Sequence, residues 1–390
     1  MRPSGGIVDR QTDLLIIGAG PFGLAMAAYA RHLDIDHLVV GNPMSFWREN
    51  MPAGMLLRSA CDWHLDPGCV YTIERFLNDQ GLKPADVTPL SLEFYLRYVQ
   101  WFQQQAAIES MPSHVRRLEM VDGQRARFQA ELENGDTVRA KHVLLAIGFR
   151  HFVHQPGELI ARLPRNHFRH TCDLVDPEGL KGKRCLIVGG RQSAFEWAAL
   201  LNDAGAETVH VSYRHDSPRF AESDWGWVNP LIERFVTEPG WYRALPSNER
   251  EALNHRFWIE GRLKVEPWLE PRLRMDTTKL WPRTQIESVM TRPDRAMQVA
   301  LDNGSVLAID QIILAAGYKA DVSKVPLLAQ GNLLPKLGLL NGCPMLDDNL
   351  QTTIPGLFIT SLLATQEFGP FFAFTVSART SARLVAQAIR

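Results

Sequence analysis

The stretch "IIGAGPFGLAMAA", residues 16–28, decides the fold. An apolar run ends in Gly18, Gly20 and Gly23, which have the spacing G-x-G-x-x-G, and small apolar residues follow. In this motif the first glycine allows a tight turn, the second lets the backbone approach a pyrophosphate, and the third lets helix and strand pack closely. Backbone amides and the positive end of the helix dipole then hold the phosphates. The stretch therefore predicts a strand, a turn and a helix that bind a dinucleotide.

The residues beside this turn complete the predicted dinucleotide site. Pro21 and Phe22 lie inside the motif, and we expect both to contact the cofactor. The next predicted strand, residues 37–40, ends in Gly41 and Asn42. An acidic residue usually binds a ribose at this position. Asn42 takes its place, and its amide can bond a hydroxyl group.

A second stretch, "LIVGGRQSAFEWA" at residues 186–198, repeats the pattern with one change. Arg191 stands where the second glycine is expected, so its side chain must point away from the phosphates or reach around to them. The following predicted strand ends at Arg214, from which a guanidinium can grip an adenosine 2′-phosphate. These residues favour NADPH over NADH, and a turn with a purely structural role is the alternative. The predicted contacts are Gly189, Gly190, Arg191, Gln192, Ser193 and Arg214.

Both turns open a βαβ unit, and each unit is closed much later by an apolar strand. The closing segments are "HVLLAIGFR" from His142 and "QIILAAGYK" from Gln311. Strands joined by crossover helices form parallel sheets. The sequence therefore predicts an α/β fold with two Rossmann-like dinucleotide-binding domains. One long stretch, between Phe220 and Pro282, has no regular pattern.

Composition excludes several classes of function. The 390 residues are 45% hydrophobic and 22% charged, with a formal net charge of −1, which argues against a nucleic-acid binder. No segment approaches the about eighteen apolar residues of a membrane span, and the start "MRPSGGIVDRQTD" lacks the apolar part of a signal peptide. We expect a cytoplasmic protein. Its five cysteines are scattered and show no metal-ligand spacing, so no disulfide scaffold and no metal site is predicted.

Taken together, these motifs resemble the class B flavin-dependent monooxygenases, which include flavin-containing, N-hydroxylating and Baeyer-Villiger enzymes. The resemblance covers nearly the whole chain. It rests on both glycine turns, both closing segments, and "IPGLFITSLLATQEFGPFFAF" from Ile354. "FWRENMPAGMLLRS", residues 46–59, is similar to the flavin-proximal loop of these proteins. Trp47 would form its aromatic wall, and Arg48 beside it is a further expected cofactor contact.

The resemblance implies a domain organisation and a reaction. Residues 1–155 and 318–390 would form an FAD-binding domain, and residues 156–317 an NADPH-binding domain with a tryptophan-rich insert at about 220–282. NADPH would pass a hydride to the flavin. The reduced flavin would react with dioxygen to a peroxyflavin, which gives one oxygen atom to a small apolar or aromatic substrate.

A helix expected to start at "FGPFFAF" would aim its first amides, around Gly369, Pro370 and Phe371, at the flavin pyrimidine edge. The alternative is an ordinary Gly-Pro helix start packed by phenylalanines.

Some family features are missing. Thiol reductases of similar architecture carry a cysteine pair beside the flavin and a Gly-Asp pair near the C-terminus. This chain lacks the cysteine pair and has "ITSLLA" instead of Gly-Asp, which argues against dithiol chemistry. The Baeyer-Villiger fingerprint is not matched around His170. An NADPH-dependent reductase or oxidase without substrate oxygenation is the nearest alternative, and a non-catalytic flavin-binding sensor is a weaker one.

Tryptophans and polar residues suggest where a substrate would bind. Six of the ten tryptophans lie in or beside the stretch from Phe220 to Pro282. They either pack a helical insert or form a lid over an apolar pocket, in which case Trp225 and Trp227 would contact the substrate. Near the flavin loop, Arg58, Asp62 and His64 are the catalytic candidates. The alternatives are a surface salt bridge from Arg58 to Asp62 or Asp66 and a structural role for His64.

Overall fold

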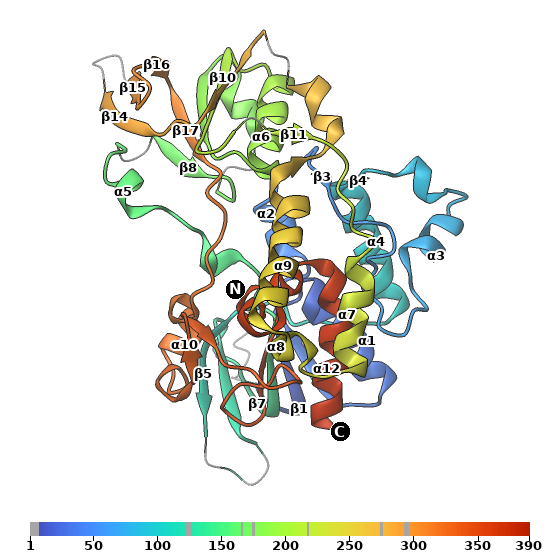
Figure 1. Cartoon of the computed structure of the whole chain (residues 1–390). Coiled ribbons are helices and arrows are strands. Elements are labelled where there is room, and N and C mark those ends of the chain that lie inside the picture. The colour runs from blue at the N-terminus through green and yellow to red at the C-terminus, as the bar shows by residue number, and fades with distance from the viewer. Residues whose placement is uncertain are drawn as a thin grey trace, which may run out of the picture.

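A mixed sheet and a parallel sheet, each carrying one glycine turn, form the framework of the protein. The structure is a computed structural model that describes residues 8–121, 123, 126–164, 167–173, 176–216, 218–273, 276–291 and 296–390. The first sheet lies at the bottom of Figure 1 and the second at the top. Helices α2 and α9 lie between them in this view. The predicted α/β fold with two Rossmann-like units is confirmed.

The first sheet contains the segment quoted at the start. Its order is β2-β1-β7-β6-β5, and β20 pairs in parallel with the end of β7. Helix α1 (Pro21–His32) follows β1 directly and packs against the C-terminal helix α12 (Ala378–Ile389). The C-terminal segment thus completes the unit that the N-terminal segment begins. The strands are β1 (Asp9–Ile17), β2 (His37–Val40), β5 (Val115–Met120), β6 (Phe128–Leu132), β7 (Thr137–Leu145) and β20 (Leu357–Ile359).

The second sheet repeats this plan. Its order is β13-β10-β9-β17-β8, with all pairs parallel, and α6 (Gln192–Asp203) follows β9 after the glycine turn. A smaller antiparallel sheet, β14-β15-β16, lies beside it. The strands are β8 (Phe168–His170), β9 (Arg184–Val188), β10 (Thr208–Tyr213), β13 (Thr278–Pro282), β14 (Ile286–Thr291), β15 (Met297–Leu301), β16 (Val306–Ile309) and β17 (Gln311–Leu314).

Short elements connect and flank the sheets. The strand pairs are β3 (Leu56–Leu57) with β4 (Leu90–Ser91), β11 (Arg219–Phe220) with β12 (Lys264–Val265), and β18 (Leu339–Leu340) with β19 (Cys343–Pro344). The helices are α2 (Ser45–Glu49), α3 (Ile73–Asn78), α4 (Leu92–Gln105), α5 (Gly157–Ile160), α10 (Pro326–Ala329) and α11 (Thr365–Phe368). None of the helices described is long and apolar enough to cross a membrane.

The stretch from Phe220 to Pro282 is mostly helical, although its sequence shows no regular pattern. It forms α7 (Val228–Thr237), α8 (Trp241–Ala244) and α9 (Ser247–Trp258). In α7, Val228, Ile232 and Phe235 recur at helical spacing and are buried. Asp224 and Gly226, which interrupt the apolar pattern in the sequence, lie before the helix begins. The apolar face of α7 packs against α12, so the insert is joined to the first unit.

The helix expected to start at Gly369 was a wrong prediction. Gly369 is followed by two short 3₁₀ turns, and α12 begins only at Ala378. Phe374 between the turns has an extended backbone, with φ −115° and ψ 159°. Phe371 and Phe372 before it are fully buried. The amides near Gly369 therefore do not start a long helix, and no macrodipole adds to them.

Candidate cofactor and substrate site

The glycines of the first turn have distinct physical roles. Gly18 has φ +109°, and a Cβ added to it would lie 2.3 Å from the Ala146 carbonyl oxygen. A Cβ on Gly23 would lie 1.8 Å from the Gly18 carbonyl oxygen. Both positions therefore require glycine for packing. A Cβ on Gly20 would meet no protein atom within 4 Å, because Gly20 faces a cavity.

This first-turn cavity fits an extended anionic dinucleotide. It has a volume of about 440 Å³ and is lined by Gly18, Gly20, Pro21 and Phe22. Gly20 caps helix α1 without a side-chain hydrogen bond, so the first free amides of the helix are available to phosphate oxygens. A Gly20 side chain would fill the space where those oxygens would lie. The turn thus offers an anion site that no protein group occupies.

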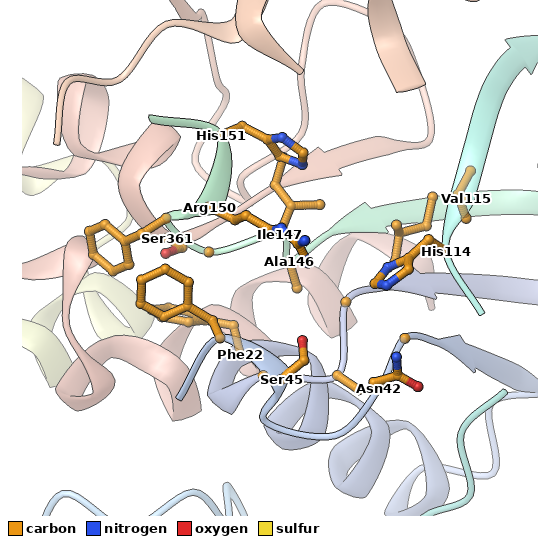
Figure 2. Close-up of a pocket in the computed structure, with 18 of the residues that line it drawn as sticks. Phe22, Asn42, Ser45, His114, Val115, Ala146, Ile147, Arg150, His151 and Ser361 are labelled. Carbon is orange, nitrogen blue, oxygen red and sulfur yellow. The ribbon is translucent and has the colours of Figure 1, made fainter. Parts of the chain in front are cut away.

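The two ends of the first-turn cavity differ in character. Figure 2 shows Asn42 and His114 at one end, and Phe22 and Ser361 at the other, with Ser45 between them. The Ser361 hydroxyl is buried without a hydrogen-bond partner in the structure. A buried hydroxyl without a partner is costly, and a ligand hydroxyl or phosphate would satisfy it. These residues fit FAD, whose polar chain would lie along this wall.

Trp47 forms a rigid wall at the end of the first-turn cavity. Its ring stacks on Tyr95, with 5.0 Å between the ring centroids. Tyr95 is fully buried, and burial raises the pKa of its hydroxyl above the usual range. A side chain locked against such a neighbour holds one position. Trp47, which we expect to form the aromatic wall of the flavin-like loop, is thus held against a buried neighbour.

The second glycine turn has the same construction. Gly189 has φ +142°, and an added Cβ would lie 2.5 Å from the Ala315 carbonyl oxygen, as Gly18 does against Ala146. Ala194 stands at the third position of the motif and is fully buried. The two turns thus share the geometry of their first position, and the second turn accepts the Cβ of Ala194 at the third.

Arg191 points away from the second turn and into the insert. Its Nη1 donates to the Arg262 carbonyl oxygen at 2.8 Å, and its guanidinium lies 5.1 Å from the Trp258 ring centroid. Arg191, Arg214 and Arg262 all line a second-turn cavity of about 530 Å³. Burial lowers the pKa of Arg191, and the charges of Arg262 and Arg214 lower it further. Such crowding of cations fits a multiply charged anion such as a dinucleotide phosphate.

A middle cavity of about 350 Å³ joins these two cavities. It shares Phe46, Trp47 and Phe149 with the first-turn cavity, and Gly317 and Tyr318 with the second-turn cavity. The rings of Phe149 and Tyr318 are 5.1 Å apart, and those of Phe46 and Tyr318 are 6.2 Å apart. This aromatic cluster stands where the three cavities meet. Two dinucleotides in the outer cavities would therefore point toward a shared apolar chamber.

Residues 15–240 match the model of the pyridine nucleotide-disulphide oxidoreductase family, which is more than half of the chain. The chain belongs to this family. Membership confirms the predicted oxidoreductase class and the expected cofactors, FAD and NADPH. Among curated relatives, a ferredoxin–NADP reductase of Paraburkholderia phymatum is 27% identical over 221 residues, which are 56% of this chain and 55% of the relative.

A thioredoxin reductase of Mycoplasma genitalium is 25% identical over 209 residues, which are 52% of this chain and 55% of the relative. The chain thus spans about half the length of the curated relatives it matches.

Solved structures resemble the whole chain. An ornithine N-hydroxylase of Kutzneria sp. 744, with reduced FAD, NADP⁺ and L-ornithine, has a TM-score of 0.76 at 15% identity and covers 97% of this chain and 99% of its own. An L-lysine 6-monooxygenase from Pseudomonas syringae has a TM-score of 0.72 at 18% identity and covers 97% and 100%. The predicted likeness to class B flavin monooxygenases is confirmed for the fold of this family member.

Within this oxidoreductase, Arg58 lies apart from the other two catalytic candidates. Arg58 lines the middle cavity, and its Nε donates to Glu266 Oε1 at 2.7 Å. Its ion-pair partner is thus in the insert and is neither Asp62 nor Asp66. Asp62 and His64 line a fourth cavity. Among the described residues, it shares only Val376 with the middle cavity.

Several other predicted contact residues line a different cavity from the one expected, or none. Arg48 is exposed and does not line the first-turn cavity, and Gln192 bonds Glu196 and the Glu266 amide. Ser193 lines the middle cavity. Trp225 lines the middle cavity, but Trp227 lies outside its lining and packs on Phe371. Gly369, Pro370 and Phe371 line none of the four cavities described, and Ala373, Phe374 and Thr375 line the middle cavity in their place.

Three residues that the sequence analysis did not select are important in the site. Ser361, Asn50 and Tyr318 line the cavities, and each lies in a segment that the resemblance already singled out. Asn50 lies in the flavin-like loop, Tyr318 is the next-to-last residue of the second closing segment, and Ser361 lies in the segment that replaces the Gly-Asp pair. The resemblance identified the segments that contain these residues but did not identify the residues themselves.

His64 is buried and should make stability depend on pH. Its side chain is bonded to Arg379 through Nε2 at 2.6 Å, and burial lowers its pKa to about 4. Between pH 6.5 and about 4 the unfolded chain binds more protons, so stability is present above pH 6.5 and is lost as pH falls through this range. At about 1.4 kcal/mol per pKa unit, the loss amounts to about 3 kcal/mol.

Urea unfolding at several pH values checks this expectation. The His64→Gln variant should lose less stability than the unmodified protein between pH 7 and pH 4.5. His32→Gln, at an exposed position at the end of α1, is the matched control and should leave the pH dependence unchanged. Equal slopes for His64→Gln and the unmodified protein would show that His64 is not the titrating group.

Proposed function

We propose that the chain is an FAD- and NADPH-dependent monooxygenase that transfers one oxygen atom of dioxygen to a small organic substrate. The row of three adjoining cavities carries this proposal. Its outer members fit dinucleotides, and its middle member is an apolar chamber of about 350 Å³ at their junction. A reductase that only passes electrons to a protein partner has no need for such a chamber beside the cofactors.

We assign each cofactor to one part of the chain. FAD binds to residues 1–155 and 318–390, where β20 and α12 complete the sheet and helix layer around the first turn. NADPH binds to residues 156–317, with the insert at about 220–282 supplying Trp258 and Arg262 to the second-turn cavity. Arg214 follows β10 and is placed to bind the 2′-phosphate.

The side chains around the junction would orient the reactants and exclude water. When bound, FAD supplies an acceptor for the hydride of NADPH and a centre that reacts with dioxygen. Trp47, held against Tyr95, limits where the flavin ring can lie. Phe46, Phe149 and Tyr318 surround the junction with apolar surface. Excluding water from the junction would favour transfer of the oxygen atom to the substrate over side reactions with water.

A reductase is the second candidate, because the curated relatives at 25–27% identity are reductases. Disulfide chemistry has little support in this chain. All five cysteines are free, and Cys61, Cys172, Cys185 and Cys343 are buried or partly buried with raised pKa values because burial disfavours the thiolate. If the chain is a reductase, it would therefore pass electrons to a protein or to dioxygen.

Coupling measurements separate the two candidates. The holoenzyme is incubated with NADPH, ¹⁸O-labelled dioxygen and a panel of small aromatic compounds. NADPH loss, hydrogen peroxide and labelled product are then measured. A monooxygenase should give labelled product in proportion to NADPH consumed. NADPH loss accompanied only by peroxide, or by reduction of added ferredoxin, would overturn the proposal in favour of the reductase.

A further inference from the structure

The walls of the middle cavity are aromatic and aliphatic, with few polar groups. Trp63 and Phe257 flank Trp225 there, with ring centroids 6.0 Å and 5.7 Å from it. Aromatic rings arranged in this way favour flat aromatic ligands. The apolar side chains of the lining, besides these three, are Phe46, Trp47, Met51, Pro52, Met55, Leu57, Phe149, Trp197, Val228, Phe374 and Val376.

The cavity has no free charge with which to hold a charged ligand. Arg58 is the one charged residue among the described residues that line it. Four of its five N–H donors are already used: Nε donates to Glu266, Nη1 to the Gly261 carbonyl, and Nη2 to the Glu260 carbonyl and the Ser223 hydroxyl. Glu266 neutralises its charge. A carboxylate or ammonium group in this chamber would lose its hydration without gaining a counter-charge.

Among the described residues that line the cavity, Asn50 and Trp225 each carry a buried polar atom that has no hydrogen-bond partner. The Asn50 amide donates through Nδ2 to the Cys172 carbonyl oxygen at 2.9 Å. Because a carbonyl can only accept, this bond fixes the orientation of the amide and leaves Oδ1 as an acceptor, which has no partner. The Trp225 indole N–H, which can only donate, also has no partner. A ligand that pairs with both would remove two unfavourable buried groups.

We propose that the middle cavity takes an uncharged aromatic substrate that carries a hydrogen-bond donor for Asn50 Oδ1 and an acceptor for Trp225 Nε1. This inference rests on the proposed function and names its substrate class. It separates the chain from the ornithine and lysine hydroxylases that share its fold, because the substrates in their names carry charged groups. The fold is shared with these hydroxylases, but the proposed substrate class is not.

Binding to the oxidised holoenzyme tests the proposal without turnover. The probes are 4-hydroxyacetophenone, which has both groups, phenol, which lacks the acceptor, and acetophenone, which lacks the donor. 4-Hydroxybenzoate and L-ornithine supply the charged comparisons. Dissociation constants are measured from changes in flavin absorbance and tryptophan fluorescence. 4-Hydroxyacetophenone should bind about tenfold more tightly than phenol or acetophenone, and the charged probes should bind more weakly still.

A pair of matched variants assigns the contact. Trp225→Phe keeps an aromatic ring and removes the N–H group. It should weaken binding of 4-hydroxyacetophenone by about tenfold and change binding of phenol by less than about twofold. Trp227→Phe is the control, because the Trp227 indole lies outside the cavity lining and already donates to the Asp224 carbonyl oxygen. It should change neither constant.

Tighter binding of L-ornithine or 4-hydroxybenzoate than of 4-hydroxyacetophenone overturns the inference. An unchanged constant for 4-hydroxyacetophenone in Trp225→Phe also overturns it, and the probe series decides alone if that variant does not fold. The proposed function can fail separately. If the probes bind in the expected order and no oxygenated product forms with NADPH, the chamber is as inferred and the monooxygenase proposal is wrong. If a charged amino acid is oxygenated, the monooxygenase proposal holds and the inferred substrate class is wrong.

Discussion

Replacing Gly20 by leucine is expected to abolish FAD binding while leaving the fold intact. A Cβ at this position meets no protein atom within 4 Å, so the apoprotein has room for the larger side chain. The added atoms would lie where the dinucleotide phosphates must approach the amides of α1. We expect the dissociation constant for FAD to rise by more than about a hundredfold, or about 2.7 kcal/mol. Flavin absorbance per protein and reconstitution titrations measure it.

The controls for Gly20→Leu come from two other glycines. Gly179→Leu introduces the same side chain at a glycine with open space around it and without a positive φ, far from the first turn in sequence, and should leave FAD binding unchanged. Gly18→Ala should prevent folding, because its Cβ would lie 2.3 Å from the Ala146 carbonyl oxygen. A Gly20→Leu protein purified with a full complement of flavin would contradict the assignment of the first-turn cavity.

Replacing Arg214 by alanine should separate the two nicotinamide cofactors. Arg214 lines the second-turn cavity, and we propose that its guanidinium bonds the adenosine 2′-phosphate, which NADH lacks. The KM for NADPH should rise by about thirtyfold to a hundredfold, whereas the KM for NADH should change by less than about threefold. Steady-state oxidation of each nucleotide by the FAD-loaded enzyme measures both constants.

Arg219→Ala is the matched control for Arg214→Ala. Arg219 is an exposed residue of β11, belongs to the same positive region of the sequence and does not line the second-turn cavity. Its replacement should change the KM values for NADPH and NADH equally and only slightly. Equal increases in KM for NADPH and NADH in the Arg214→Ala enzyme would refute selection by the 2′-phosphate.

The two glycine turns could be predicted because their causes are local. Gly18 and Gly189 have positive φ and a close neighbour. The alanines that directly follow the closing strands, Ala146 and Ala315, supply that neighbour in both units. Strand, turn and helix follow one another within a short stretch in each case, so the periodic pattern of the sequence is enough to identify them.

The middle cavity could not be predicted in detail because distant segments build it. The Asn50 amide bonds the Cys172 carbonyl oxygen across 122 positions, and Arg58 bonds Glu266 across 208 positions. Tertiary packing also decides that Trp225 faces the chamber and Trp227 does not, although both lie in one short turn. Sequence patterns identify the segments that take part, and only the fold shows which side chains meet.

Rapid mixing of the reduced protein with dioxygen tests the central claim most directly. The purified holoenzyme is reduced anaerobically with NADPH and mixed with oxygenated buffer in a stopped-flow spectrophotometer. The monooxygenase account predicts a long-lived species that absorbs in the near ultraviolet before oxidised flavin returns, because the apolar junction protects it from water. Immediate return to oxidised flavin would contradict the account and leave the chain a reductase.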